Sequence, residues 1–226
     1  KITLGLGALG FSFGPGTIAA IVRRSGDGTK QIAVGAGAAA AGCWLGVEKA
    51  NVVFSRFSGT ESEGTTTLLA AHGWALIAVT KASGTIAPVL HLRKYSTGVA
   101  VHETAATAAA NVTPATNATI GRRVTVDEWG GQIAVAGYWN VVLTNAQIEA
   151  LAFDLSTWFV VQPKGLWILD QNPTAIKVAD LTGLGANESA LIGTTVATAA
   201  VPVWNRGASV VVKVRQTAAG IITRTA

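Results

Sequence analysis

Short apolar runs separated by turn residues follow one another along the chain, and most runs are rich in β-branched or small residues. The runs predicted as strands are residues 17–22, 31–35, 43–47, 51–57, 65–70, 74–80, 89–95, 99–103, 119–121 and 132–139. In one of them, Leu90 and Leu92 alternate with His91 and Arg93, which predicts one buried face and one polar face. Short strands at this spacing predict an all-β fold, an antiparallel β-sandwich.

Turn residues separate the first predicted strands. Asp27 and Gly28 follow the run at residues 17–22, and Asp-Gly between two apolar runs is a strong hairpin signal. We therefore expect residues 31–35 to pair with residues 17–22. Residues 48–51 are expected to form the next turn.

One helix has a strong signal. Thr144 can act as its N-cap, and Gln147 stands three residues later, which is the spacing of a capping box. Ile148, Leu151 and Ala152 would then share one apolar face. The pattern predicts a short helix near residues 145–153 that packs against the sandwich.

Composition shifts divide the chain into three parts. Residues 1–15 are glycine-rich, residues 16–160 carry the strand pattern, and residues 161–226 form a β-rich C-terminal extension. The extension contains strand-like sequence, including residues 208–216, but few large apolar side chains. Such a segment is too poor in apolar residues for a core of its own, so we expect it to pack on the sandwich or on a neighbouring subunit.

The composition is apolar and poor in charge, with 50% hydrophobic and 13% charged residues. Average soluble domains have about 25% charged residues. A surface of this kind is tolerated when other subunits cover it, so we expect a homo-oligomer or an assembly component. The net charge is +5, but the basic residues are not interleaved with stacking aromatics, and no nucleic-acid partner is expected. Pro15 and several glycines interrupt the uncharged residues 4–22, which argues against membrane insertion.

No catalytic motif has its required context. Residues 5–10 match G-x-G-x-x-G and residues 10–14 match G-x-S-x-G, but Pro15 and Gly16 prevent the helix that both motifs need. Close acid pairs occur at Glu61/Glu63 and Asp127/Glu128, and both are expected in solvated loops rather than in a glycosidase site. We therefore predict no catalytic residue and no enzyme activity.

The sequence also gives little indication of a metal site or of a reactive thiol. His72, His91 and His102 lack the short spacing of a metal motif, so no metal site is predicted. The single cysteine, Cys43, excludes an intrachain disulfide, and its apolar neighbours predict a buried, inert thiol.

Aromatic residues supply the remaining candidates. Trp74, Trp139 and Trp158 are expected in the core, whereas Trp129 stands in a polar loop. Two alternatives remain open for Trp129: an exposed ring that stacks on a sugar or anchors a partner, or a ring that covers the end of the sandwich. The candidate ligand-binding residues are Trp129, Asp127, Glu128 and Tyr95.

Residues 16–159 resemble the laminin-G-like, concanavalin A-like jelly-roll domains. The resemblance rests on the tryptophan-led strand at residues 74–80 and on the block Leu143-Thr144-Asn145-Ala146-Gln147-Ile148-Glu149-Ala150-Leu151, which is similar to the family pattern L-[ST]-x-x-[EQ]-I-x-x-L. The chain departs from the family at residues 90–98, where the family has Tyr-x-Asn/Asp-Gly. Many members hold a calcium ion at the sandwich rim, and Asp127 is the equivalent residue here; otherwise no cofactor is implied.

These domains recur in bacteriophage virion proteins, and residues 165–170, 180–183 and 202–204 look like the tail of such proteins. The resemblance implies a non-enzymatic structural or adhesive virion component, a minor tail or baseplate protein made in the bacterial cytoplasm. Other virion proteins and host-surface glycans would be its partners. A capsid decoration protein, a free lectin-like carbohydrate-binding module and a degenerate glycosidase are the alternatives.

Overall fold

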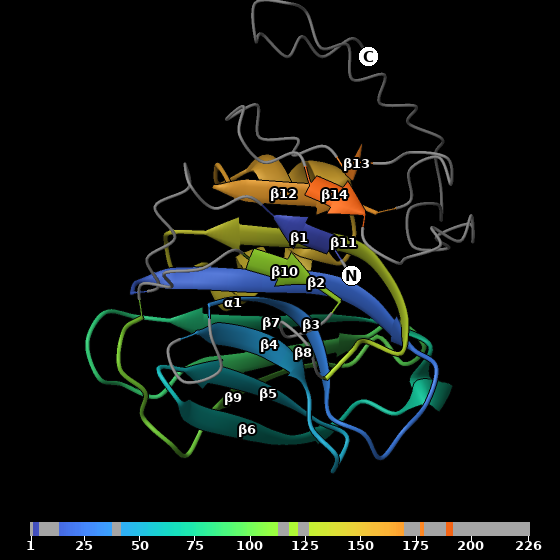
Figure 1. Cartoon of the computed structure of the whole chain (residues 1–226), viewed down its shortest axis with the longest axis horizontal. Coiled ribbons are helices and arrows are strands. Elements are labelled where there is room, and N and C mark those ends of the chain that lie inside the picture. The colour runs from blue at the N-terminus through green and yellow to red at the C-terminus, as the bar shows by residue number, and fades with distance from the viewer. Residues whose placement is uncertain are drawn as a thin grey trace, which may run out of the picture.

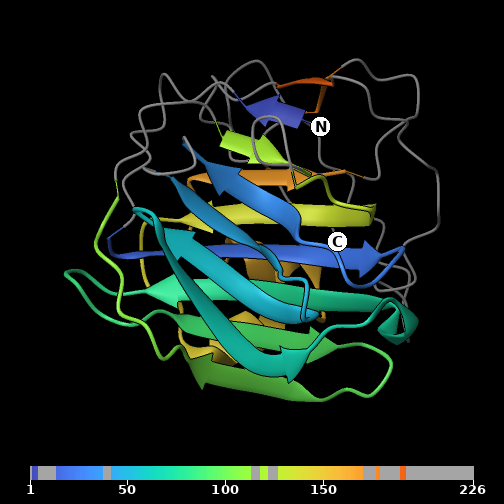
Figure 2. The same ribbon diagram turned by 60° about the horizontal axis from the view of Figure 1, so that its bottom comes forward.

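The computed structural model describes residues 2–4, 14–37, 42–112, 118–121, 127–169, 177–178 and 189–191. Within these residues, two antiparallel sheets lie face to face (Figures 1 and 2). The eight-stranded sheet has the order β13 (Lys177–Val178), β14 (Ser189–Leu191), β1 (Ile2–Leu4), β10 (Ala118–Ile120), β3 (Gln31–Ala36), β4 (Cys43–Val47), β5 (Val52–Phe57) and β6 (Thr60–Thr67). The six-stranded sheet has the order β12 (Gly165–Ile168), β11 (Gly131–Trp139), β2 (Gly16–Arg24), β7 (Trp74–Lys81), β8 (Val89–Lys94) and β9 (Ala100–Thr104). The helices are η1 (Ala70–His72), α1 (Asn145–Leu151) and η2 (Leu155–Phe159).

The predicted fold class is confirmed: the protein is an antiparallel jelly-roll β-sandwich, with one short α-helix among the described residues. The capping box of α1 forms as the spacing predicts. The backbone N–H of Gln147 donates to Thr144 Oγ1 at 3.3 Å, and the N–H of Thr144 donates to Gln147 Oε1 at 2.9 Å. These reciprocal bonds satisfy two backbone donors that the first helical turn leaves free.

Strand β2 is buried on both of its faces. Ile18, Ala20 and Val22 point into the core between the sheets, whereas Ala19 and Ile21 belong to a second core on the outer face of the six-stranded sheet. The residues of α1 and η2 cover that outer face, and this explains why the β2 sequence is apolar without alternation. Cys43 lies fully buried in the core between the sheets, as predicted, and burial raises the pKa of its thiol.

A row of small residues lets the helical layer approach the sheet. The strand register aligns Gly137, Ala19 and Ala78 across three neighbouring strands. A Cβ on Gly137 would lie 2.7 Å from the ring of Trp139 and 2.9 Å from the ring of Trp158, so only glycine leaves room for both rings. The expectation that these two tryptophans lie in the core is confirmed.

One predicted pairing is wrong. Strands β2 and β3 do not form a hairpin, because β11 and β7 occupy the two edges of β2. Strand β3 lies in the other sheet, between β10 and β4, so residues 25–30 cross from one sheet to the other. The Asp27-Gly28 turn is present, with Gly28 at a φ of 74°, but it joins two layers rather than two neighbouring strands.

The sandwich extends beyond residues 16–160. Strand β12 pairs with β11, and both Leu166 and Trp167 are buried, so part of the predicted extension completes the six-stranded sheet. Strand β1, from the predicted N-terminal segment, pairs with β10. The predicted strand at residues 208–216 lies outside the described residues. Across the described ranges, no helix is long and apolar enough to cross a membrane.

Candidate functional site

The sequence-predicted ligand residues occupy one end of the sandwich, but they do not converge. Trp129 is 9% exposed, belongs to the core between the sheets, and donates from Nε1 to the carbonyl of Arg23 at 3.2 Å. Tyr95 packs against the core on the opposite face of the six-stranded sheet and donates from Oη to the carbonyl of Ala152 at 2.8 Å. Of the two alternatives for Trp129, its burial fits a ring that covers the sandwich end.

Asp127 and Glu128 stand in the loop just before Trp129. Asp127 has a φ of 57°, and its carbonyl accepts a hydrogen bond from the N–H of Ile32 at 3.0 Å. Glu128 is exposed. A role of these residues, or of Tyr95, in ligand binding stays a prediction.

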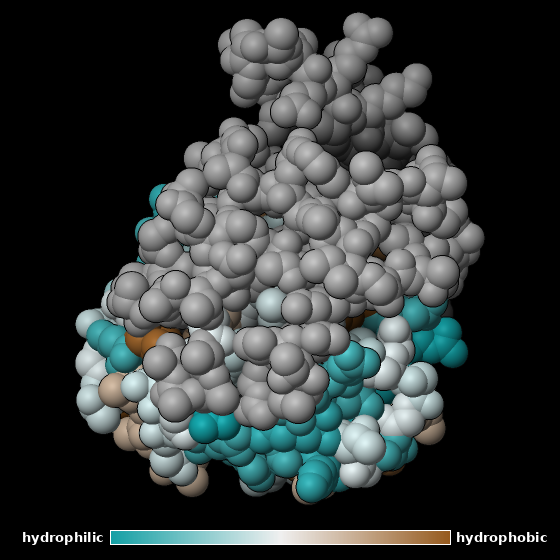
Figure 3. All heavy atoms as spheres, in the orientation of Figure 1, coloured by the Kyte–Doolittle hydropathy of each residue, from teal (hydrophilic) through white to brown (hydrophobic). Residues whose placement is uncertain are grey.

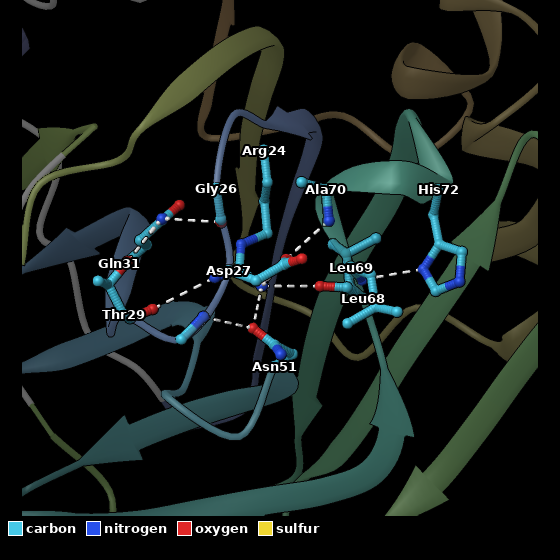
Figure 4. A network of polar contacts seen from close by, with 11 residues as sticks. Arg24, Gly26, Asp27, Thr29, Gln31, Asn51, Leu68, Leu69, Ala70 and His72 are labelled. Atoms are coloured by element: carbon cyan, nitrogen blue, oxygen red, sulfur yellow. Dashed lines mark hydrogen bonds and ion pairs between the residues drawn. The ribbon is translucent and has the colours of Figure 1, made fainter.

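A buried arginine organises the same end of the sandwich (Figure 4). The Nη1 atom of Arg24 donates to Asn51 Oδ1 and to the carbonyl of Leu68, both at 2.8 Å, and Nη2 donates to the carbonyl of Thr29 at 3.3 Å. Asp27 lies 3.5 Å from the guanidinium and accepts a hydrogen bond from the N–H of Ala70 at 2.8 Å. These bonds tie three connections between strands together, so Arg24 acts as a structural clamp.

Strand register builds a different site on the outer face of the eight-stranded sheet, the face turned away from the six-stranded sheet. Trp44 and Phe54 lie on this face, in a cluster separate from the core between the sheets. The register places Arg56 beside Trp44 and Glu61 beside Arg56, and it places Glu63 beside Phe54. Because cross-strand partners share a face, the side chains of Arg56, Glu61 and Glu63 gather over β5 and β6.

Lys30 and Glu48 complete this group from the connections that flank β3 and β4. The Nζ atom of Lys30 lies 2.8 Å from Glu48 Oε2 and 2.6 Å from Glu61 Oε1, and Arg56 Nη1 lies 3.3 Å from the same Glu61 oxygen. Lys30 Nζ also stands 4.5 Å from the centre of the Phe54 ring. We call Lys30, Glu48, Arg56, Glu61 and Glu63 the charged cluster.

The charged cluster is half-buried and reachable from solvent. The ion-paired side chains are between 16% and 32% exposed, and Glu63 is exposed. Burial alone would lower the pKa of Lys30, but hydrogen bonds and charges from Glu48 and Glu61 outweigh burial and raise it. In the orientation of Figure 1, hydrophilic side chains gather where β5 and β6 lie (Figure 3).

The cluster carries one more carboxylate than it has cations. One oxygen from each of Glu48, Glu61 and Glu63 lies within 4.8 Å of the others, a grouping that in principle suits a metal ion. The ammonium of Lys30 already contacts two of the three carboxylates. A calcium ion would need the same carboxylate oxygens as ligands, so the ammonium competes with it. The residues present therefore fit an internal ion-pair network better than a calcium site.

The prediction that Glu61 and Glu63 lie in a solvated loop is wrong. Both belong to β6, whose polar sequence hides the strand because its inward residue is also polar. Ser62 is 1% exposed and donates to the carbonyl of Thr107 at 3.0 Å. The spacing of Glu61 and Glu63 by two residues could have indicated a strand, because residues two apart lie on the same face of a strand.

A pocket in the helical layer has a mostly apolar lining, unlike the charged cluster. Its lining is Trp139, Leu143, Gln147, Ala150, Leu151, Thr157, Val160 and Val161. Three of these side chains, Trp139, Gln147 and Thr157, can form hydrogen bonds, and the indole of Trp139 already donates to the carbonyl of Val161 at 2.8 Å. The charged cluster is therefore the better candidate for a polar ligand.

Comparison with known proteins gives structural neighbours only; no family model and no curated protein sequence matches the chain. The CBM40 module of a Ruminococcus gnavus IT-sialidase, bound to α2,3-sialyllactose, is 15% identical with a TM-score of 0.47, covering 61% of this chain and 82% of that one. Domain 4 of a GH43 extracellular arabinanase from Geobacillus stearothermophilus, in complex with arabinotriose, is 15% identical with a TM-score of 0.45, covering 62% and 67%. A heptameric SAP-like pentraxin from Limulus polyphemus is 10% identical with a TM-score of 0.44, covering 66% and 72%. Similarities this low say nothing about the ligand of the present chain.

Replacing Lys30 with methionine should turn the charged cluster into a cation-binding site. The change keeps the apolar stem of the side chain but removes the ammonium that contacts Glu48 and Glu61. Three carboxylates then stay close together. We expect the free energy of unfolding to fall by about 1–3 kcal/mol, because charged acceptors lose their donor. Added Ca²⁺ should restore part of this loss, and Tb³⁺ luminescence sensitised by tryptophan should report binding directly.

Lys49→Met is the matched control, since Lys49 is exposed next to Glu48 in sequence. It should change neither stability nor Tb³⁺ binding. Equal Tb³⁺ affinity in the unmodified protein and in Lys30→Met would show that Lys30 does not block the carboxylates.

Proposed function

We propose that the protein is a non-enzymatic adhesive module that binds a glycan through the charged cluster, as a component of a tailed-phage virion. The carrying observation is the fixed array of Lys30, Arg56, Glu61 and Glu63 on an accessible sheet face. Sugar hydroxyls both donate and accept hydrogen bonds. A surface that offers carboxylate acceptors beside ammonium and guanidinium donors can meet both needs.

The same geometry supports a binding role rather than hydrolysis. Glycosidases need one carboxyl group that stays protonated and a second that stays ionised. Glu61 forms ion pairs with both Lys30 and Arg56. Glu63 is exposed, so it is not enclosed in an apolar pocket of the kind that surrounds the acid of a glycosidase. The degenerate glycosidase therefore stays an alternative, to be tested by activity.

The virion part of the proposal rests on the sequence resemblance, in which residues 165–170, 180–183 and 202–204 look like the tail of phage virion proteins. A minor tail or baseplate position accords with adhesion, and capsid decoration is the nearest alternative. Labelling purified phage particles with an antibody against this chain tests the assignment. Signal at the tail supports it, signal over the capsid favours decoration, and a chain found only free in lysate favours a lectin-like module.

Glycan binding is tested by two variants, in each of which the neutral glutamine of the same shape replaces a glutamate. Glu63→Gln removes an exposed carboxylate for which no ion pair is seen among the described residues, so it should leave the fold intact. If Glu63 accepts hydrogen bonds from the sugar, affinity on a glycan array and by calorimetry should fall about tenfold or more, since hydrogen bonds to charged groups contribute about 1.5–3 kcal/mol.

Glu128→Gln is the control, because it changes the same group at the sandwich end. Loss of binding in Glu128→Gln alone would move the site to the end that the sequence suggested. The absence of any glycan ligand for the unmodified protein would refute the proposed function. Release of sugar from a polysaccharide would favour the glycosidase alternative.

A further inference from the structure

A chain of hydrogen bonds crosses the outer face of the six-stranded sheet, away from the charged cluster. Thr80 Oγ1 lies 2.9 Å from His91 Nε2, and His91 Nδ1 lies 2.8 Å from His102 Nδ1. His102 Nε2 lies 2.8 Å from Glu149 Oε1. The chain therefore links β7, β8 and β9 to helix α1. His91 is 2% exposed, so its ring has no access to bulk water.

The contact between the two Nδ1 atoms restricts where protons can lie. One of these nitrogens must donate and the other must accept, so the contact holds a single proton. If His102 is neutral and donates from Nε2 to Glu149, its Nδ1 must accept from His91. His91 then carries its proton on Nδ1, and its Nε2 accepts from the hydroxyl of Thr80.

Protonation of the pair reverses this order. When His102 carries protons on both nitrogens, its Nδ1 donates and His91 Nδ1 must accept. The proton of His91 then lies on Nε2 and is donated to Thr80. One added proton thus changes the tautomer of His91, the charge of His102 and the direction of the Thr80 hydrogen bond together. A second added proton has no place in this geometry.

The charged and polar groups around the two histidines are consistent with the uptake of a single proton. Glu149 faces His102 from α1, and Arg93 on β8 lies 3.6 Å from the other oxygen of Glu149. Thr80 is the neutral end of the chain on β7. On β9 itself, Glu103 is engaged with Thr65 instead, accepting from its N–H at 2.6 Å. Burial, reinforced by the charge of His102, lowers the pKa of His91 to about 3, which keeps this ring neutral.

We propose that Thr80, His91, His102 and Glu149 form a one-proton switch that sets how firmly α1 is held on the sheet. When His102 is neutral, it donates a hydrogen bond to the carboxylate of Glu149. When His102 is charged, the same contact becomes an ion pair, and the attraction between opposite charges strengthens it. Protonation of His102 therefore tightens α1.

Nitrogen-detected NMR of the histidine rings in the full chain tests the switch, between about pH 8 and about pH 5, where histidine usually changes charge. We expect His91 to change from the Nδ1–H tautomer to the Nε2–H tautomer while His102 gains a proton, with one shared midpoint. His72 is an internal reference, because its Nδ1 accepts from the N–H of Leu69 at 2.8 Å and must stay unprotonated in the neutral ring.

Amide exchange gives a second readout. Protection factors of α1 should rise several-fold on the acid side, and Glu149→Gln should abolish the rise. Thr80→Val, which keeps the shape of the side chain, leaves His91 Nε2 without its partner in both states and should move the shared midpoint. A single His91 tautomer across the titration, or α1 protection that ignores pH, would overturn the proposal.

Discussion

Replacing Arg24 with alanine is expected to lower the free energy of unfolding by about 3–5 kcal/mol, because several oxygens lose a charged donor and each one left unsatisfied costs about 1–3 kcal/mol. The Arg24 side chain is fully buried, and its guanidinium bonds to Asn51, Leu68 and Thr29. Its removal leaves a cavity and takes one donor from each of three oxygens, of which Asn51 Oδ1 keeps the N–H of Gly28. Equilibrium unfolding in urea, analysed at a common slope, measures the change.

Arg23→Ala is the matched control, because Arg23 is the preceding residue of the same strand and is exposed. Its effect should stay within about 0.5 kcal/mol. Asp27→Asn should also be mild, since Asp27 is 41% exposed and 3.5 Å from the guanidinium. Equal losses for Arg23→Ala and Arg24→Ala would mean that the loops at this end are not held by the clamp.

Features that depend on neighbouring residues in sequence were predictable. The α1 capping box of Thr144 and Gln147 formed where its spacing placed it, and β7 and β11 lie within one residue of their predicted bounds. The sheet partners of β2 were not predictable in the same way. Asp27-Gly28 specifies a local turn, but the competition of β3, β7 and β11 for the edges of β2 is decided by long-range packing.

The charged cluster illustrates why a site is harder to predict than a strand. Lys30 and Glu61 meet only because β3, β4, β5 and β6 take one particular register. A slip of one residue would send Glu61 to the other face of its strand. For Trp129, the polar sequence neighbours left both an exposed ring and a ring covering the sandwich end open, and only the packing of the two sheets shows that the ring is buried.

Trp158→Ala should destabilise the fold by about 3–5 kcal/mol, the usual cost of deleting a large buried aromatic side chain. Trp158 is 0% exposed, its ring centre lies 5.5 Å from that of Trp139, and its Nε1 donates to the carbonyl of Leu151 at 2.8 Å. The residue therefore joins η2, α1 and the sheet. Calorimetric and urea unfolding should both show one transition, displaced to lower stability.

Phe153→Ala provides the control in the same helical layer. Phe153 is 62% exposed, and the guanidinium of Arg93 lies 4.3 Å from the centre of its ring, a cation–π pair that contributes about 0.5–1 kcal/mol when exposed. If the helical layer is an integral part of the core, Trp158→Ala must cost several times more than Phe153→Ala. If instead the layer were a loosely attached cover, Trp158→Ala would release α1 in a separate early transition and leave the main unfolding of the sandwich unchanged. Glu149 sits on α1, so this outcome would also remove the helix on which the His102 contact depends.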